Sequence, residues 1–376
     1  MVYLDYAATT PLDPAVLETM LPYLKDVWGN PSSPHAKGRA ARAAIDQSRQ
    51  KIAILSGYKP AEVLFTGSGS ESNTLAIRGV CDRFELEHGH TGHIITTETE
   101  HTSVLSPIAA LEKRGWTATR LRVDAEGLID LTDVKEAMHD DTVLLSMHWA
   151  NNETGTIQPV AEIIKLFRER NILCHLDALQ AVGLLPFPSP LPDLMSIAAH
   201  KFHGPKGIGI LFARQHVNLE PLVRGGGQEQ GLRCGTENTP GIVGLAKAFE
   251  IAMSELQVTS SKLKKLSDYF IEHVTSNLEL VTLNGSKDHR LPSIVNLHVS
   301  NHDGAALVIQ LDQRGICVST GAACATGAAE PSHVLQAMGQ SEKLAGQNLR
   351  VSFGKETTVQ EVETFLRELN NLILDK

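Results

Sequence analysis

The chain has 376 residues, of which 42% are hydrophobic and 20% charged, and its formal net charge is −9. This length predicts roughly two or three domains with a large buried core, and the acidic balance argues against direct nucleic-acid binding, which needs clustered Lys and Arg. The first residues lack the basic and apolar regions of a signal peptide, and no apolar run is long enough to span a bilayer. We therefore expect a cytoplasmic protein that does not bind membranes.

Strand and helix patterns alternate along the first two thirds of the chain. Helices are predicted at 40–57 and 160–171, and strands at 61–67, 93–101, 141–151 and 171–180, followed by two strands around a glycine turn within 193–214. Strands that are apolar throughout and alternate with helices indicate an α/β fold, in which helices cover both faces of a mostly parallel sheet.

The last third begins with two long predicted helices, at 239–257 and 260–278, and then alternates again until a closing amphipathic helix at 358–374. We predict a large α/β domain over residues 15–260. Residues 1–14 and 261–376 are predicted to form a smaller α+β domain.

Cysteine usage predicts free thiols. Five cysteines are present, an odd count without a C-x-x-C pair, which argues against a disulfide framework or a structural zinc site. The stretch HGHTGH (88–93) lies in a glycine-rich loop without carboxylates, so we expect no metal site there. Cys324 lies among small residues, and that pattern fits either an idle thiol or a nucleophile on a mobile loop.

Polar residues follow several predicted strands, where ligands bind in open α/β sheets. Residues 67–72 (GSGSES) open a helix and offer N–H groups to an anion, or simply form a capped turn. Asp177 is either a helix N-cap or the counter-ion of a cationic ring nitrogen. Lys201 is either a solvated lysine or the partner of an aldehyde cofactor in a Schiff base. His101 and Asn152 stand at comparable strand ends.

Together these residues match the requirements of pyridoxal 5′-phosphate. The cofactor needs an anion cradle, a carboxylate for its pyridine nitrogen, a lysine for its aldehyde, and side chains that hold its ring. Arg350 enters a predicted strand, either as a salt bridge at the edge of the core or as a fork for a substrate carboxylate.

The sequence resembles the cysteine desulfurases of the class V aminotransferase type, in the subgroup that supplies iron–sulfur cluster assembly. The resemblance covers essentially the whole chain. It rests on VLFTGSGSESNTLAI, TETEH, NNETG, HLDALQAVG, HKFHGPKGIG and RCGTEN, and on Cys324, which Glu-Pro-Ser follows six residues later. It implies the aspartate-aminotransferase-like fold (fold type I), with a mostly parallel seven-stranded sheet and a smaller α+β domain that carries the Cys324 loop.

The resemblance also implies roles for individual residues. Lys201 would hold the cofactor and move protons at the substrate Cα, His101 would stack on the ring, and Asp177 would pair with its nitrogen. Gln180 and Asn152 would contact the ring oxygen or the substrate carboxylate. The phosphate would be held by Gly69, Ser70 and His200, and by Thr236 of the other subunit of an obligate homodimer. Arg350, helped by Asn30, would bind the substrate carboxylate.

The implied reaction converts L-cysteine to L-alanine, with the sulfur held as a persulfide on Cys324. An acceptor protein for iron–sulfur, tRNA or DNA thiolation would then take the sulfur. We expect residues of about 321 to 330 to be displaced or poorly ordered at rest, since the thiol must travel. The alternatives are an aminotransferase or β-lyase in which Cys324 is incidental, and a scaffold that has lost catalysis.

The sequence departs from the usual family pattern at a few positions. Ala198 stands where a Ser is usual, which removes one expected phosphate contact. Asn73 and Thr74 replace a usual acidic or amide pair, and Cys234 beside Arg233 is unusual, although we expect it to be a small residue of a tight loop.

Overall fold

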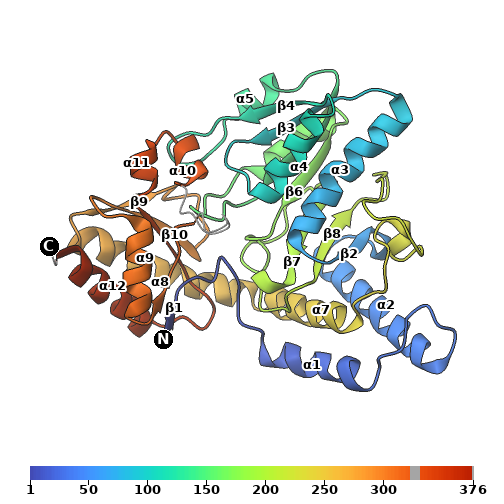
Figure 1. Ribbon diagram of the computed structural model, residues 1–376, viewed down its shortest axis with the longest axis horizontal. Coiled ribbons are helices and arrows are strands. Elements are labelled where there is room, and N and C mark those ends of the chain that lie inside the picture. The colour runs from blue at the N-terminus through green and yellow to red at the C-terminus, as the bar shows by residue number, and fades with distance from the viewer. Residues whose placement is uncertain (322–330, 375–376) are drawn as a thin grey trace.

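The computed structural model describes residues 1–321 and 331–374 (Figure 1). A seven-stranded sheet with the strand order β2-β8-β7-β6-β5-β3-β4 forms its centre. The strands are β2 (Val63–Thr66), β3 (His93–Thr97), β4 (Thr117–Leu121), β5 (Thr142–His148), β6 (Leu173–Asp177), β7 (Leu194–Ala198) and β8 (Gly209–Ala213). Only β8 runs antiparallel to its neighbours in this sheet. The predicted α/β class and the mostly parallel seven-stranded sheet are therefore confirmed.

The two faces of this sheet bury separate apolar cores. Leu64 and Leu144 pack with α3 (Gly69–His88) and α4 (Thr102–Glu112), whereas the adjacent Phe65 and Leu145 pack with helices on the opposite face. Successive side chains of a strand point to opposite faces, so a strand without polar gaps must be covered on both. The helices of the second face include α2 (Ala36–Ser56), α6 (Val160–Glu169) and α7 (Thr239–Ser254), and α1 (Pro14–Lys25) packs on α7.

A smaller antiparallel sheet has the order β12-β10-β9. Its strands are β9 (Val281–Asn284), β10 (Ile294–Val299) and β12 (Asn348–Ser352), and the helices that share its core are α8 (Leu256–Asn277), α9 (Gly304–Gln313) and α12 (Val359–Leu374). At the chain start, β1 (Val2–Tyr3) pairs in parallel with β11 (Ile316–Cys317), so the N-terminus lies with the C-terminal part of the chain. The exact domain limits stay a prediction. α8 begins at 256, four residues before the start predicted for this helix.

Short elements complete the chain. They are α5 (Leu131–Glu136), α10 (His333–Ala337), α11 (Glu342–Ala345) and the 3₁₀ helices η1 (Pro60–Glu62), η2 (Ala199–Lys201) and η3 (Glu229–Gly231). The helices end where the sequence supplies a stop: α3, for instance, ends at Gly89, which takes the left-handed conformation (φ 74°) that glycine adopts without strain. In the described part of the chain, no helix has the length and apolar character needed to cross a membrane.

Candidate active site

Lys201 lies at the end of η2, directly after β7, and contacts the N-terminal segment. Its Nζ donates hydrogen bonds to the carbonyl oxygens of Ala7 (2.6 Å) and Ala8 (3.0 Å). Gln180, which follows β6, donates from Nε2 to the same Ala7 oxygen (3.0 Å). The fold therefore brings two of the predicted cofactor residues together around one backbone carbonyl that the sequence did not single out.

Asp177 is the last residue of β6, and its side chain is buried. It accepts hydrogen bonds from the backbone N–H of Leu179 (3.0 Å) and from Nδ2 of Asn73 (2.7 Å). Burial raises the pKa of Asp177, and these two hydrogen bonds oppose that shift only in part. A buried carboxylate at this strand end is well suited to a cationic partner, because such a partner offsets the loss of hydration.

Asn73 links Asp177 to the predicted stacking residue His101. Its Nδ2 also donates to Oγ of Ser103 (2.9 Å), and the Ser103 N–H donates to Nδ1 of His101 (3.1 Å). His101 is the N-cap of α4, and β3 already ends at Thr97, so the predicted strand over 93–101 was too long. The sequence marked Asn73 only as a departure from the family pattern, and its contact with Asp177 emerges from the packing of α3 on the sheet.

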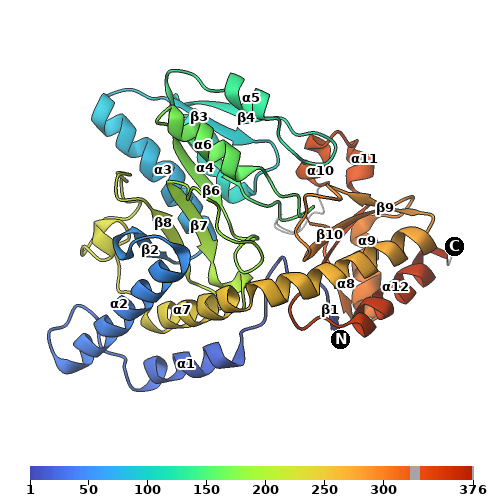
Figure 2. The same cartoon turned by 180° about the vertical axis from the view of Figure 1, so that it is seen from behind.

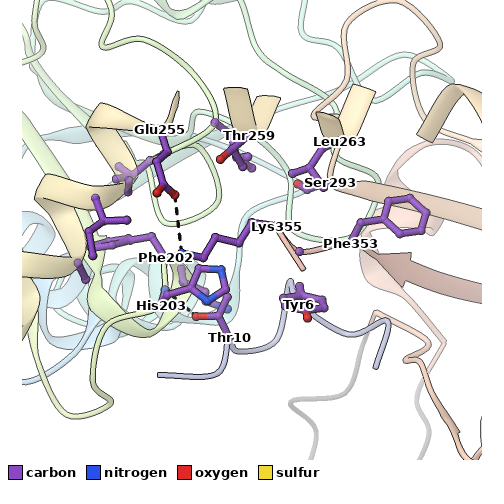
Figure 3. A pocket seen from close by; sticks show the side chains of 18 of the residues that line it. Tyr6, Thr10, Phe202, His203, Glu255, Thr259, Leu263, Ser293, Phe353 and Lys355 are labelled. Atoms are coloured by element: carbon purple, nitrogen blue, oxygen red, sulfur yellow. Dashed lines mark hydrogen bonds and ion pairs between the residues drawn. The ribbon is translucent and has the colours of Figure 1, made fainter. Parts of the chain in front are cut away.

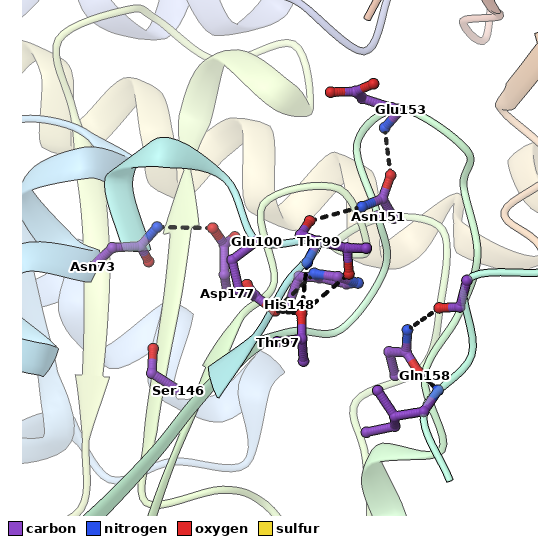
Figure 4. A network of polar contacts seen from close by, with 12 residues as sticks. Asn73, Thr97, Thr99, Glu100, Ser146, His148, Asn151, Glu153, Gln158 and Asp177 are labelled. Carbon is purple, nitrogen blue, oxygen red and sulfur yellow. Dashed lines mark hydrogen bonds and ion pairs between the residues drawn. The ribbon is translucent and has the colours of Figure 1, made fainter. Parts of the chain in front are cut away.

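A second buried carboxylate lies near Asp177 (Figure 4). Glu100 is fully buried and accepts from Oγ1 of Thr97 (2.7 Å), and its Oε1 is 2.9 Å from Nδ1 of His148. Burial lowers the pKa of His148, but the Glu100 carboxylate outweighs burial, so that this pKa is raised overall. Sequence reasoning missed both residues, since an acid and a histidine in separate segments carry no local signal of pairing.

The predicted anion cradle, residues 67–72, lies at the beginning of α3. Ser68 caps the helix, Gly69 is its buried first residue, and Ser70 is exposed in the first turn. A Cβ at Gly69 would lie 2.4 Å from Cδ2 of Leu179. Glycine at this position therefore allows the start of α3 to pack against Leu179, two residues after Asp177. The N–H groups of a helix's first turn lack helical acceptors and favour an anion.

His200 precedes Lys201 and faces the N-terminal segment as well. Its Nδ1 is 3.2 Å from Oγ1 of Thr9, and its carbonyl oxygen accepts from both the N–H and the hydroxyl of Thr10. Burial, together with the charges of Lys201 and Lys206, lowers the pKa of His200 to about 4. The ring is therefore neutral at pH 7 and suits hydrogen bonding better than charge pairing.

Arg350 occupies the middle of β12 and is 3% exposed. Its Nη1 donates to the carbonyl oxygen of Asn152 (3.1 Å), and its Nη2 pairs with Oδ1 of Asp5 (2.8 Å). The Arg350 backbone also exchanges hydrogen bonds with Ser319, five residues before Cys324. The structure thus joins Arg350 to the backbone of Asn152 and to Ser319, which precedes the segment that carries Cys324.

Three predicted site residues are not joined to this group within the described chain. Asn30 is exposed in the loop between α1 and α2, where its Oδ1 accepts from the N–H of Ser32. Both views place this loop far from β10, the neighbour of β12 in the smaller sheet (Figures 1 and 2). Thr236 is exposed in the loop after η3. Cys324, with the expected displaced conformation of its loop, lies outside the described residues and stays a prediction.

A cavity of about 70 Å³ borders Lys201 on the side of α7 and α8 (Figure 3). Its wall combines residues of the N-terminal segment, of the α7–α8 junction and of the segment after β12. Lys355 crosses between these parts, since its Nζ pairs with Oδ2 of Asp13 (2.7 Å) and lies 3.7 Å from Oε2 of Glu255. This ion pair connects the chain start to the C-terminal part next to the candidate site.

Among the described residues, His93, His139 and Asp141 form one group with metal-ligand spacing, within 4.8 Å of one another. His93 belongs to the HGHTGH stretch. Both of its ring nitrogens already contact threonine hydroxyls, those of Thr142 (2.9 Å) and Thr119 (2.8 Å), and its ring stacks on His139. These contacts account for the buried histidine without an ion.

Comparison with known proteins places the chain in a family. The aminotransferase class-V model matches residues 2–365. A cysteine desulfurase IscS of Dictyoglomus turgidum is 44% identical, with 99% of this chain and 94% of that protein covered, and one of Neisseria meningitidis is 43% identical, with 98% and 91% covered.

Solved structures agree with this placement. A NifS-like protein superposes with a TM-score of 0.92 at 36% identity, with 99% of both chains covered. A structure described as SspA in complex with cysteine gives a TM-score of 0.82 at 36% identity, with 95% of this chain and all of that chain covered. The chain therefore belongs to the class-V aminotransferase family, among its cysteine desulfurases.

Proposed function

We propose that this chain is a pyridoxal-phosphate-dependent cysteine desulfurase, which converts L-cysteine to L-alanine and passes the sulfur to an acceptor protein through Cys324. The observation that carries the proposal is that Asp177 and Lys201 lie at the carboxyl ends of the neighbouring strands β6 and β7, with the buried Arg350 on the smaller sheet. The names of the relatives favour this activity over an aminotransferase, a β-lyase or a scaffold that has lost catalysis.

The residues present fit pyridoxal phosphate. The first turn of α3, at Gly69 and Ser70, offers N–H groups to the phosphate, with His200 and the partner subunit's Thr236 as further donors. Asp177 has a raised pKa and two donors, so a protonated ring nitrogen would complete its contacts. Gln180 shares the Ala7 carbonyl with Lys201, so its amide would be close enough to the lysine-bound group to donate to the ring oxygen.

The cofactor, when bound, supplies an aldehyde that condenses with amines and a ring that accepts electrons from the substrate Cα. Lys201 would exchange its hydrogen bonds to Ala7 and Ala8 for this aldehyde, and its Nζ would later move the proton at Cα. His101 would cover the ring and assist proton transfer. Its Nδ1 accepts from Ser103, so a neutral ring carries its proton on Nε2.

Arg350 would orient the substrate by its carboxylate. Its Nε is buried and, among the described residues, has no hydrogen-bond acceptor, so a substrate carboxylate would satisfy a donor that is otherwise costly to bury. The Cys324 thiolate would then attack the substrate sulfur. A sulfur–sulfur bond forms, the carbon–sulfur bond breaks with its electron pair left on Cβ, and protonation there yields alanine.

A homodimer is part of the proposal. The exposed side chains of Leu17, Leu21 and Leu24, which are 44%, 37% and 55% exposed, follow one another at helical spacing along α1. An apolar stripe of this kind on a surface helix favours contact with another protein, and a second copy would also bring in Thr236. Sedimentation velocity tests this point: Leu21→Glu with Leu24→Glu should shift the protein toward monomer, whereas the exposed Ile54→Glu should not.

The activity is tested with L-cysteine and a thiol reductant, by measuring alanine and sulfide. Cys324→Ala should abolish alanine formation, and the mass of the wild-type Cys324 peptide should rise by one sulfur after L-cysteine is added without reductant. Full activity of Cys324→Ala, with pyruvate or another keto acid as product, would instead indicate a β-lyase or an aminotransferase.

The cofactor is tested by absorbance. Wild-type protein should show the visible band of a lysine-bound aldehyde, and Lys201→Ala should lose it, while the exposed Lys206→Ala should keep it. If wild-type protein saturated with pyridoxal phosphate never shows such a band, the proposed chemistry is wrong.

A further inference from the structure

Glu100 and His148 lie in contact deep in the large domain, next to Asp177 (Figure 4). Oε1 of Glu100 lies 2.9 Å from Nδ1 of His148, and their side chains are 0% and 6% exposed. Among the described residues, Oε2 of Glu100 and both ring nitrogens of His148 have no hydrogen-bond partner, so the contact at 2.9 Å is one of proximity and charge. Water screens such a pair very little, so each partner depends strongly on the charge of the other.

The pair is adjacent to Asp177. His148 ends β5 and Asp177 ends β6, and the two are register partners in parallel strands, so their side chains project from the same face of the sheet. Trp149, the residue after His148, donates its N–H to the carbonyl oxygen of Asp177 (2.9 Å), which keeps the two strand ends together. Glu100 reaches this place from the turn between β3 and α4 (Figure 4).

A protonated histidine would balance the charges of this cluster. Glu100 and Asp177 are both buried carboxylates, and two such groups in one apolar region cannot both remain ionised without a cation. The other groups that face Asp177 are the uncharged Asn73 and the partly buried His101, while Thr97 donates to Glu100. His148 is the one described basic group within ion-pair distance of Glu100.

We propose that His148 is an electrostatic positioning residue: as an imidazolium it neutralises Glu100, so that Asp177 alone carries the net negative charge that a protonated pyridine ring meets. The assignment rests on the proposed function for its link to the cofactor. The charge state of His148 itself does not, because Glu100 and His148 both belong to the protein and are in contact without the cofactor. Burial lowers the pKa of His148 while Glu100 and Asp177 raise it, with a net rise.

The charge state is measured by ¹⁵N NMR of the cofactor-free protein labelled at histidine, with His148→Gln used for assignment. Both ring nitrogens of His148 should be protonated at pH 7.5, where an unperturbed histidine is mostly neutral. In Glu100→Gln the His148 ring should be neutral at the same pH. A neutral His148 in the wild-type protein, or no change in Glu100→Gln, overturns the proposal whether or not the protein is a desulfurase.

The link to the cofactor is measured by the dissociation constant for pyridoxal phosphate in a double-mutant cycle. His148→Gln leaves Glu100 as an uncompensated neighbour of Asp177, which raises the pKa of Asp177 further and favours its protonated form. A protonated Asp177 no longer pairs with a protonated ring nitrogen, so binding should weaken roughly 10-fold, which corresponds to one pKa unit. The double variant His148→Gln, Glu100→Gln removes both charges and should return to within about threefold of wild type.

Simple loss of packing predicts a different result, since the effects of the two single variants would then add in the double variant. Additive losses therefore overturn the proposal. His93→Gln is the matched control, because His93 is also a buried histidine of the same sheet but lies at the start of β3. It should leave the dissociation constant within about twofold.

Discussion

Arg350 and Asp5 form an ion pair at 2.8 Å although they are 345 positions apart in the chain. Asp5 lies in the segment that follows β1, and an isolated β-bridge pairs it with Ser352, two residues after Arg350. The arginine that we expect to bind the substrate carboxylate is therefore held in place by a carboxylate of the protein itself, with Nε left to meet the ligand.

This geometry predicts the behaviour of Arg350→Lys. A lysine keeps the charge but loses the planar fork, so it cannot contact Asp5, Asn152 and a carboxylate at once. We expect the KM for L-cysteine to rise roughly 10- to 100-fold, as the loss of a charge-assisted hydrogen bond implies, with a smaller change in kcat. Steady-state alanine formation measures both constants, and Arg367→Lys, on the exposed side of α12, is the control. An unchanged KM would exclude Arg350 as the carboxylate site.

The Lys355–Asp13 pair predicts a pH-dependent contribution to stability. Burial raises the pKa of Asp13, but the hydrogen bonds from Lys355 and from the Ala15 N–H lower it more, and the result is a lowered pKa. A carboxyl group whose pKa is lower in the folded than in the unfolded chain stabilises the fold at pH values above its unfolded pKa. This stabilisation is lost as the pH falls through the folded pKa.

Lys355→Met should therefore lower the free energy of unfolding by about 1 kcal/mol at pH 7, and the difference from wild type should shrink toward pH 3. Urea unfolding at both pH values measures it, with the exposed Lys343→Met as the control. A difference that stays constant between pH 7 and pH 3 would show that the lysine acts through packing alone.

The buried His175 should make the folded protein less stable in acid. His175 is fully buried between the hydroxyls of Ser146 (2.8 Å) and Ser196 (2.9 Å), and burial lowers its pKa to about 3. The unfolded chain binds a proton near pH 6.5 while the folded chain does not, so stability falls as the pH drops below 6.5.

Between pH 6.5 and pH 5 this effect amounts to about 2 kcal/mol. His175→Gln should be less stable than wild type at pH 7.5, yet should lose less stability on acidification. Urea unfolding of both proteins at pH 7.5 and 5 checks this, with the exposed His90→Gln as reference. Equal losses in wild type and His175→Gln would contradict the assignment.

The close packing around Gly209 connects the central sheet to the start of α3, where the anion cradle is proposed. Gly209 begins β8, and a Cβ there would lie 2.8 Å from the carbonyl oxygen of Ile197 and 3.0 Å from the backbone carbon of Ser68, the N-cap of α3. Backbone atoms cannot yield as a side-chain end can, so Gly209→Ala should cost about 1–3 kcal/mol of stability and shift the start of α3.

Thermal unfolding and the affinity for pyridoxal phosphate measure the two effects. Gly346→Ala is the matched control, because an added Cβ at Gly346 meets its nearest heavy atom at 3.6 Å. Wild-type affinity and stability in Gly209→Ala would show that the cradle does not depend on this close approach.

The local pattern of the sequence was enough to predict the fold class and the central pair of the site. Apolar strands that alternate with helices required a sheet covered on both faces, and Asp177 and Lys201 stood out because each charged residue directly follows an apolar strand. The motifs then supplied the family. These signals are local, since burial period and strand ends can be read from neighbouring residues.

The tertiary structure decided which residues meet. The strand order places His148 beside Asp177, the pairing of β1 with β11 brings the N-terminal segment to Lys201 and Arg350, and α3 carries Asn73 onto Asp177. None of these contacts joins neighbours in sequence, and each depends on how the sheet arranges segments that loops of many residues separate. The sequence therefore determined the type of fold and the chemistry of the strand ends, while the electrostatic setting of that chemistry was decided by long-range packing.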